Sequence, residues 1–182
     1  VIPRMMRVKQ HFALNDIVIH RCGMPQIVNL IVSVNGEYLA TYSADGIIIS
    51  TPTGSTGYSM SAGGPIVDPK ADLMLITPIN PHSALAKSIV VGSDAEIDVI
   101  LAKRRQEEDE EAEVSFDGDR FVHMKVGDSI HIKKAPESAK ILKLNQLSFL
   151  QILRKKCRRF IKNGKDWVNM ERQNIFDVTH RD

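Results

Sequence analysis

The chain has 182 residues, 43% of them hydrophobic, and a formal net charge of +2 at pH 7. Such a chain can build a core in one large domain or two small ones, whereas its small net charge does not by itself indicate a nucleic-acid partner. Two cysteines are too few for a disulfide framework, and no signal-like start or run of roughly 20 apolar residues indicates export or a membrane span. We therefore expect free thiols, a cytoplasmic location and no membrane partner.

Short strands and tight turns are predicted along most of the chain. Residues 27–34 and 37–43 are strand-like and flank Asn35-Gly36, which predicts a hairpin. Two further turns are expected at Asp45-Gly46 and Asp117-Gly118. Further strands are expected at 17–21, 47–50, 73–79, 88–92, 95–101, 113–116, 119–124, 129–134 and 139–144. This pattern predicts a mainly β fold, as a many-stranded β-sandwich or a distorted barrel.

A strongly charged stretch, residues 103–113, separates two of the predicted strands. Its sequence, KRRQEEDEEAE, has a basic start and an acidic end. Because like charges repel one another and stay hydrated, we expect a solvated loop over these residues.

The segment 146–161 has the periodicity of a C-terminal amphipathic helix. Its apolar residues recur at spacings of three and four: Leu147, Leu150, Leu153, Cys157, Phe160 and Ile161. The opposite face is basic, which is also typical of helices that bind membrane surfaces or nucleic acids. A basic outer face is common on helices that pack on a core, and aromatic residues that could stack on bases are missing, so we expect neither partner.

Several familiar catalytic and binding motifs are absent from the sequence. The six histidines show no HExxH or other close metal-ligand spacing, so no metal site is predicted, and GxSxG is absent. The segment Gly54-Ser-Thr-Gly57 lacks both the lysine of GxxxxGK[ST] and the spacing of GxGxxG. The common phosphate-binding loops are therefore excluded.

Residues 51–61 are unusually rich in hydroxyl groups. Seven of the eleven residues carry one: Thr51, Thr53, Ser55, Thr56, Tyr58, Ser59 and Ser61. Hydroxyls both donate and accept hydrogen bonds, so the segment could match an adenine edge or a ribose diol, and its glycines would allow a close approach of the backbone. An ordinary polar crossover between strands fits the same composition, which leaves the two interpretations open.

Four motifs, in this order and at plausible spacing, resemble the C-terminal domain of the ATP-NAD kinase family. They are ALND at 13–16, YSADGIIISTPTGSTGYSMSAGGPIVDP at 42–69, ITPINPHS at 76–83 and VSFDGD at 114–119. The resemblance extends over residues from about 12 to 160. It implies a β-sandwich that pairs with an N-terminal α/β domain. It also implies transfer of a phosphoryl group from ATP, or from polyphosphate in some members, to the 2′-hydroxyl of the adenosine ribose of NAD, with a divalent metal such as Mg²⁺.

The resemblance implies a set of NAD-binding residues. Asn15 and Asp16 match the family's Asn-Glu/Asp motif, and Asp45 matches its acidic residue facing the dinucleotide. The other positions match the segment that wraps the nucleotide and a variable position of the pocket wall: Thr56, Gly57, Tyr58, Ser61 and Asn80. Gly57 stands where many relatives have Ala, which should enlarge the pocket slightly.

The family's Gly-Gly-Asp-Gly motif, which carries its catalytic Asp, is not in this sequence. With Val1 as the first residue, we expect a C-terminal fragment that holds no catalytic or metal-binding residue and is inactive alone. The expected organisation is an NAD-binding β-sandwich over residues 1–145, then a helix and tail over 146–182 that would pack on the missing domain. Small-molecule nucleotides are the expected partners, and the resemblance implies a homo-oligomer, either a dimer or a tetramer.

Two alternatives to an NAD kinase stay open. A related lipid or sphingoid kinase also combines an α/β domain with a β-sandwich, although the ALND motif and the hydroxyl-rich block argue against it. A non-catalytic β-sandwich module, binding an anionic surface through the basic helix, is the other.

Overall fold

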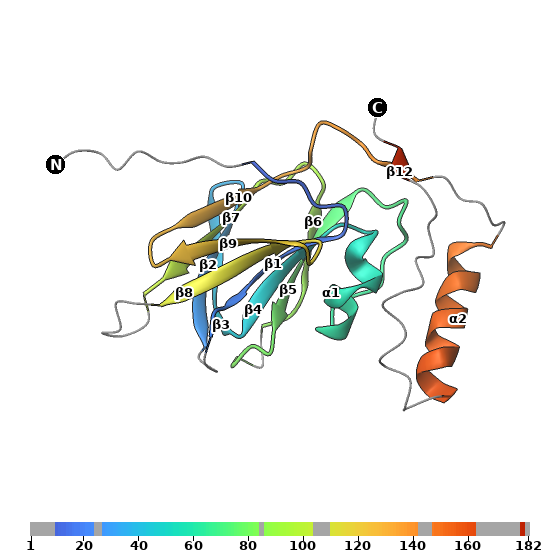
Figure 1. The fold of residues 1–182 in the computed structure, drawn as a ribbon, viewed down its shortest axis with the longest axis horizontal. Helices are drawn as coiled ribbons and strands as arrows, with labels where there is room; N and C mark the ends of the chain where they lie inside the picture. Colours follow the sequence, from blue (N-terminus) through green and yellow to red (C-terminus); the bar gives the residue numbers. More distant parts are fainter. Residues whose placement is uncertain are drawn as a thin grey trace. The chain divides into compact units, whose positions relative to one another are not determined.

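The computed structural model describes residues 10–23, 27–83, 86–103, 110–141, 147–162 and 179–180. The chain divides into two compact units, residues 1–135 and residues 136–182. The first unit contains two antiparallel β-sheets (Figure 1). This confirms the predicted mainly β fold, whereas the domain boundary expected after residue 145 stays a prediction.

The larger sheet has six strands in the order β6-β5-β4-β1-β8-β9. Their bounds are β1 Asp16–Arg21, β4 Gly46–Ser50, β5 Leu73–Ile79, β6 Ile89–Gly92, β8 Glu111–Phe116 and β9 Arg120–Lys125. The smaller sheet has the order β10-β7-β2-β3. It consists of β2 Val28–Val34, β3 Glu37–Ala44, β7 Ile97–Ala102 and β10 Ser129–Ile132. Every pairing in the two sheets is antiparallel.

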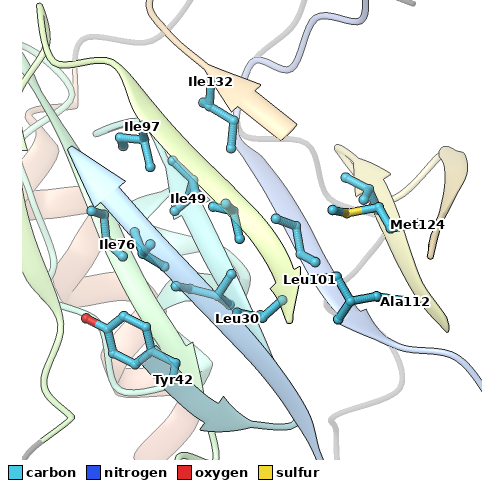
Figure 2. Packing of buried hydrophobic residues seen from close by; sticks show 14 of the residues in the cluster. Leu30, Tyr42, Ile49, Ile76, Ile97, Leu101, Ala112, Met124 and Ile132 are labelled. Atoms are coloured by element: carbon cyan, nitrogen blue, oxygen red, sulfur yellow. The ribbon is translucent and has the colours of Figure 1, made fainter. Parts of the chain in front are cut away.

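The core lies between the two sheets. Ile49 and Ile76 of the larger sheet belong to one buried cluster with Leu30, Ile97 and Leu101 of the smaller sheet (Figure 2). Because side chains alternate between the two faces of a strand, every second residue of each strand enters this core. The intervening residues of the larger sheet lie on its outer face, which the candidate site uses.

Two of the three predicted Asx-Gly turns are confirmed. The φ angles are 51° and 79° at Asn35 and Gly36, and 51° and 77° at Asp117 and Gly118. Gly adopts such positive φ values readily and Asn or Asp tolerates them, as hairpin turns require. Asp45 instead forms a single-residue bend: β3 pairs with β2 in the smaller sheet, whereas β4 pairs with β1 and β5 in the larger one. The chain therefore crosses between the sheets at Asp45.

The charged stretch is only partly a loop. Residues 104–109 lie outside the described part of the chain, but Glu110 is 7% exposed and Glu111–Phe116 form β8. The prediction of a solvated loop is therefore wrong for residues 110–113. Ala112 and Val114 enter the core, and this burial outweighs the preference of the flanking carboxylates for water.

The second unit contains the predicted C-terminal helix, α2 Phe149–Lys162, and a short pairing of β11 Lys140–Ile141 with β12 Thr179–His180. A capping box starts the helix: the Ser148 N–H donates to Gln151 Oε1 at 2.8 Å, and the Gln151 N–H donates to Ser148 Oγ at 3.2 Å. The helix is confirmed, but its amphipathic character stays a prediction. Within the described ranges, no helix is both long enough and apolar enough to cross a membrane.

Candidate functional site

A pocket of about 610 Å³ lies on the outer face of the larger sheet. Its polar lining residues come from both halves of the first unit: Asp16, His20, Arg21, Asp45, Tyr58, Asn80, Ser115 and Asp117. Val18, Ile79, Gly23 and Gly118 complete the lining. The volume is within the range of small-molecule sites, and the convergent polar groups could orient a ligand there.

Asp16 is the most deeply buried carboxylate of the pocket. It is 9% exposed, and burial, followed by repulsion from Asp117, raises its pKa to about 6. A carboxyl group with this pKa exchanges its proton near neutral pH. It can therefore accept a hydrogen bond from a ligand hydroxyl or donate one to it.

Asp117 fixes the backbone that carries Asp16. Its carboxylate accepts hydrogen bonds from the backbone N–H groups of Leu14 and Asn15, both at 2.7 Å, and of Asp16 at 3.1 Å. The Asp117 N–H in turn donates to the Asp16 carbonyl at 3.0 Å. The β8–β9 turn therefore holds the start of β1 in place.

Asp45 is held by Arg21 at the end of β1 and by Asn80, the residue that follows β5. Arg21 Nη1 lies 3.0 Å from Asp45 Oδ1, and Asn80 Nδ2 donates to Asp45 Oδ2 at 3.0 Å. Its backbone N–H donates to the Ile79 carbonyl at 3.0 Å. Arg21 is the only arginine or lysine among the described lining residues, and Asp45 already neutralises it. The pocket is therefore acidic, which suits hydroxyl and amine donors better than phosphate.

The hydroxyl-rich segment forms a 3₁₀ turn, Gly54–Thr56, and a short helix, α1 Tyr58–Ser61. Hydroxyls of this segment that bond within the protein include those of Thr51, to the Leu14 carbonyl at 2.7 Å, Ser55, to the Pro52 carbonyl at 2.7 Å, and Ser59, to Thr77 at 3.1 Å. Tyr58, in contrast, is 48% exposed and lines the pocket. Thr51, Ser55 and Ser59 therefore stabilise the fold, and Tyr58 is the hydroxyl that the segment brings to the pocket.

Close backbone contacts join this segment to β1. A Cβ atom on Gly54 would clash with the carbonyl of Asn15, so only glycine fits there without a backbone shift. A Cβ atom on Gly57 would lie 3.8 Å from Asp16 Oδ2. Gly54 therefore allows the segment to pack closely against Asn15 at the edge of the pocket.

The structure brings four of the eight predicted site residues together in the pocket: Asp16, Asp45, Tyr58 and Asn80. Gly57 lies beside Asp16, whereas Asn15, Thr56 and Ser61 are not among the described lining residues. The prediction did not include His20, Arg21, Ser115 or Asp117. Asp117 had a signal in the sequence, because its Asp-Gly turn directly follows a strand within VSFDGD.

The fold and the pocket together define a β-sandwich domain with a cavity of the size of a small-molecule site. Residues 14–144 match the model of the ATP-NAD kinase C-terminal domain. The chain therefore belongs to the ATP-NAD kinase family, as its resemblance predicted.

Curated relatives and solved structures agree with this assignment. The chain is 60% identical over 148 residues to the NAD kinase of Agathobacter rectalis, over 81% of this chain and 52% of that protein. It is 47% identical over 144 residues to the NAD kinase of Lachnoclostridium phytofermentans, over 79% and 50%. The chain thus spans about half the length of the curated relatives that it matches.

Two solved structures share the fold. Yeast NADH kinase complexed with NADH matches with a TM-score of 0.63 and 36% identity, over 65% of this chain and 34% of that one. An NAD kinase from Archaeoglobus fulgidus in complex with ATP matches with a TM-score of 0.60 and 33% identity, over 68% of this chain and 46% of that one.

Proposed function

We propose that this chain is the acceptor-binding part of an NAD kinase, which transfers a phosphoryl group from ATP, or from polyphosphate, to the 2′-hydroxyl of the adenosine ribose of NAD. The observation that carries the proposal is the pocket shared by Asp16, Asp45, Tyr58 and Asn80. These four residues stand at positions matched to the family's NAD-binding residues. Homologous kinases at up to 60% identity support the same activity.

The acidic character of the pocket fits the adenosine end of NAD. The carboxyl group of Asp16 and the phenol of Tyr58 can accept hydrogen bonds from ribose hydroxyls and from an exocyclic amine. The half-exposed ring of Tyr58 also offers a flat surface to a base. We assign Asn15, Thr56, Gly57 and Ser61 to the rim of the same site, where a ligand larger than the pocket would reach them.

The chemical step would require groups from outside this chain. Gly-Gly-Asp-Gly is absent from the sequence, and we assign the activating Asp, the ATP phosphates and a divalent metal such as Mg²⁺ to the remaining half of the protein. Phosphoryl transfer depends on positioning and on neutralising charge, so the acceptor half alone supplies little catalysis. We place the reaction in the cytoplasm, because two cysteines are too few for a disulfide framework and suit a reducing compartment. A dimer or tetramer stays a prediction, to be measured by light scattering.

A thermal-unfolding titration tests the proposal. At a free NAD concentration 100 times Kd, the chain should gain about 2.7 kcal/mol of stability. Asp45→Asn should weaken this stabilisation, whereas Asp94→Asn, which changes an exposed carboxylate outside the pocket, should leave it unchanged. Equal responses of the parent and Asp45→Asn would contradict the assigned site. No response to NAD, combined with salt-sensitive binding to anionic vesicles, would favour the interaction module instead.

A further inference from the structure

Three metal-ligating side chains meet on the outer face of the larger sheet, next to the pocket. They are Cys22 just after β1, Glu113 on β8 and His123 on β9. Strand pairing explains the meeting, because Glu113 is the register partner of His20 on one side and of His123 on the other. Cys22 lies two residues beyond His20, on the same side of the strand by the alternation of side chains.

The distances between the three side chains are those of a ligand set. Cys22 Sγ lies 3.5 Å from Glu113 Oε1, and His123 Nδ1 lies 3.7 Å from the same oxygen. The ligand atoms all lie within 4.8 Å of one another. Tetrahedral Zn²⁺, with bonds of about 2.0–2.3 Å, places its ligand atoms about 3.3–3.6 Å apart. His123 is 60% exposed, so its ring can close the remaining gap by rotating about its side-chain bonds.

The surrounding charge favours a cation. The Glu113 carboxylate lies against the Cys22 thiol, and that of Glu111 is also near, so the cluster carries negative charge. Among the described residues, the Lys125 Nζ lies 3.5 Å from Glu111 Oε1 and Arg21 pairs with Asp45, so these two cations have carboxylate partners other than Glu113.

We propose that Cys22, Glu113 and His123 bind a Zn²⁺ ion or a similar borderline transition metal. A sulfur, nitrogen and oxygen set selects such metals over Mg²⁺, which prefers oxygen ligands alone. Three protein ligands leave one position of a tetrahedral site to solvent. The ion would tie the end of β1 to β8 and β9. Arg21 and Gly23, which flank Cys22, line the pocket, so the ion would also order the pocket rim.

Titration of the 182-residue chain with Co²⁺ as a spectroscopic probe tests the site. One Co²⁺ per chain should bind with a thiolate charge-transfer band in the near ultraviolet, and Zn²⁺ but not Mg²⁺ should displace it. Cys22→Ser should abolish the band, and His123→Gln should weaken binding at least about tenfold. The matched controls Cys157→Ser and His131→Gln should behave like the parent.

The absence of a thiolate band, or a band lost in Cys157→Ser but kept in Cys22→Ser, would overturn the proposal. The unfolding midpoint of every variant is measured without metal, so that a loss of binding is not confused with a loss of folding. If Cys22→Ser does not fold, Glu113→Gln and His123→Gln carry the test, because both side chains are partly or largely exposed. The test uses no nucleotide and is independent of the proposed kinase function.

Discussion

Among individual residues, Asp16 lowers the stability of the folded chain when it is ionised, although its buried position is what brings its carboxyl group into the pocket. Its carboxylate lies at the floor of a pocket and faces the charge of Asp117, and both effects favour the protonated form in the folded state. An unfolded Asp has an ordinary pKa near 3.8. The folded protein therefore retains the proton over a pH range in which the unfolded chain releases it. The contribution of Asp16 to the free energy of unfolding is therefore largest below about pH 4, falls as the pH rises to about 6 and is level above that value.

We expect Asp16→Asn to stabilise the chain at pH 8. The amide cannot ionise, so the variant avoids a cost of about 1–2 kcal/mol, after allowance for solvent screening of a partly wetted carboxylate. Near pH 4 the two proteins should have equal free energies of unfolding, because Asp16 is then protonated. Urea denaturation at both pH values measures the difference. A variant less stable than the parent at pH 8 would show that Asp16 makes a favourable charged contact instead.

Asp117 is a structural residue of the site, and its removal should be costly. Asn tolerates the same positive φ but keeps a single acceptor oxygen, so Asp117→Asn should lose the bond from the Leu14 N–H and the charge that strengthens the others. We expect a loss of about 1–3 kcal/mol in the free energy of unfolding. Asp119→Asn, in the same turn, should change it by less than about 0.5 kcal/mol. Equal effects of the two substitutions would refute the role of Asp117 in holding β1.

Among the elements, the 3₁₀ turn and α1 lie between β4 and β5 in the chain, and α1 contributes Tyr58 to the pocket. The segment has little apolar surface of its own, and it is held by hydrogen bonds of Thr51, Ser55 and Ser59 and by the approach of Gly54 to Asn15. The position of the segment therefore depends on hydroxyl groups that, from the sequence alone, could have been expected to bind a ligand.

Alanine substitutions of Gly54 and Gly57 should differ in their effect on stability, because only Gly54 is in tight contact with Asn15. Gly54→Ala places a methyl group on the Asn15 carbonyl and should cost about 2–3 kcal/mol by overpacking. Gly57→Ala, whose Cβ would lie 3.2 Å from the Gly54 carbonyl oxygen, should cost less than about 1 kcal/mol. Thermal or urea unfolding of both variants gives the comparison. A Gly54→Ala variant as stable as Gly57→Ala would mean that the turn can move away from β1.

At the scale of the whole molecule, the proposed function places the acceptor site in this chain and the activating group outside it. The chain spans about half of its curated relatives and lacks Gly-Gly-Asp-Gly, while its acidic pocket suits the acceptor rather than the donor phosphates. We expect no NADP from the purified 182-residue chain supplied with NAD, ATP and Mg²⁺, at enzyme concentrations at which a full-length homologue gives a clear signal. Measurable turnover, assayed with an NADP-specific dehydrogenase, would show that the chain holds its own activating group.

Local signals were sufficient to predict much of this protein. Asn35-Gly36 and Asp117-Gly118 predicted their turns because positive φ values are a property of those residues themselves. The period of apolar residues likewise predicted the strands and the C-terminal helix. The prediction of a hairpin turn at Asp45-Gly46 was wrong because it depended on distant residues. Whether the chain turns back there or crosses to the other sheet is set by the strands with which β3 and β4 pair.

The sequence alone determined the β-sandwich class and the family resemblance, because periodicity, turn chemistry and motifs are carried by neighbouring residues. Only the tertiary structure decided which side chains meet. It showed that Thr51, Ser55 and Ser59 bond within the protein and that Asp117 holds β1. It also brought Cys22, Glu113 and His123 into one cluster that no close spacing indicated. The physical reason is strand pairing, which sets residues far apart in the chain side by side on one face of a sheet.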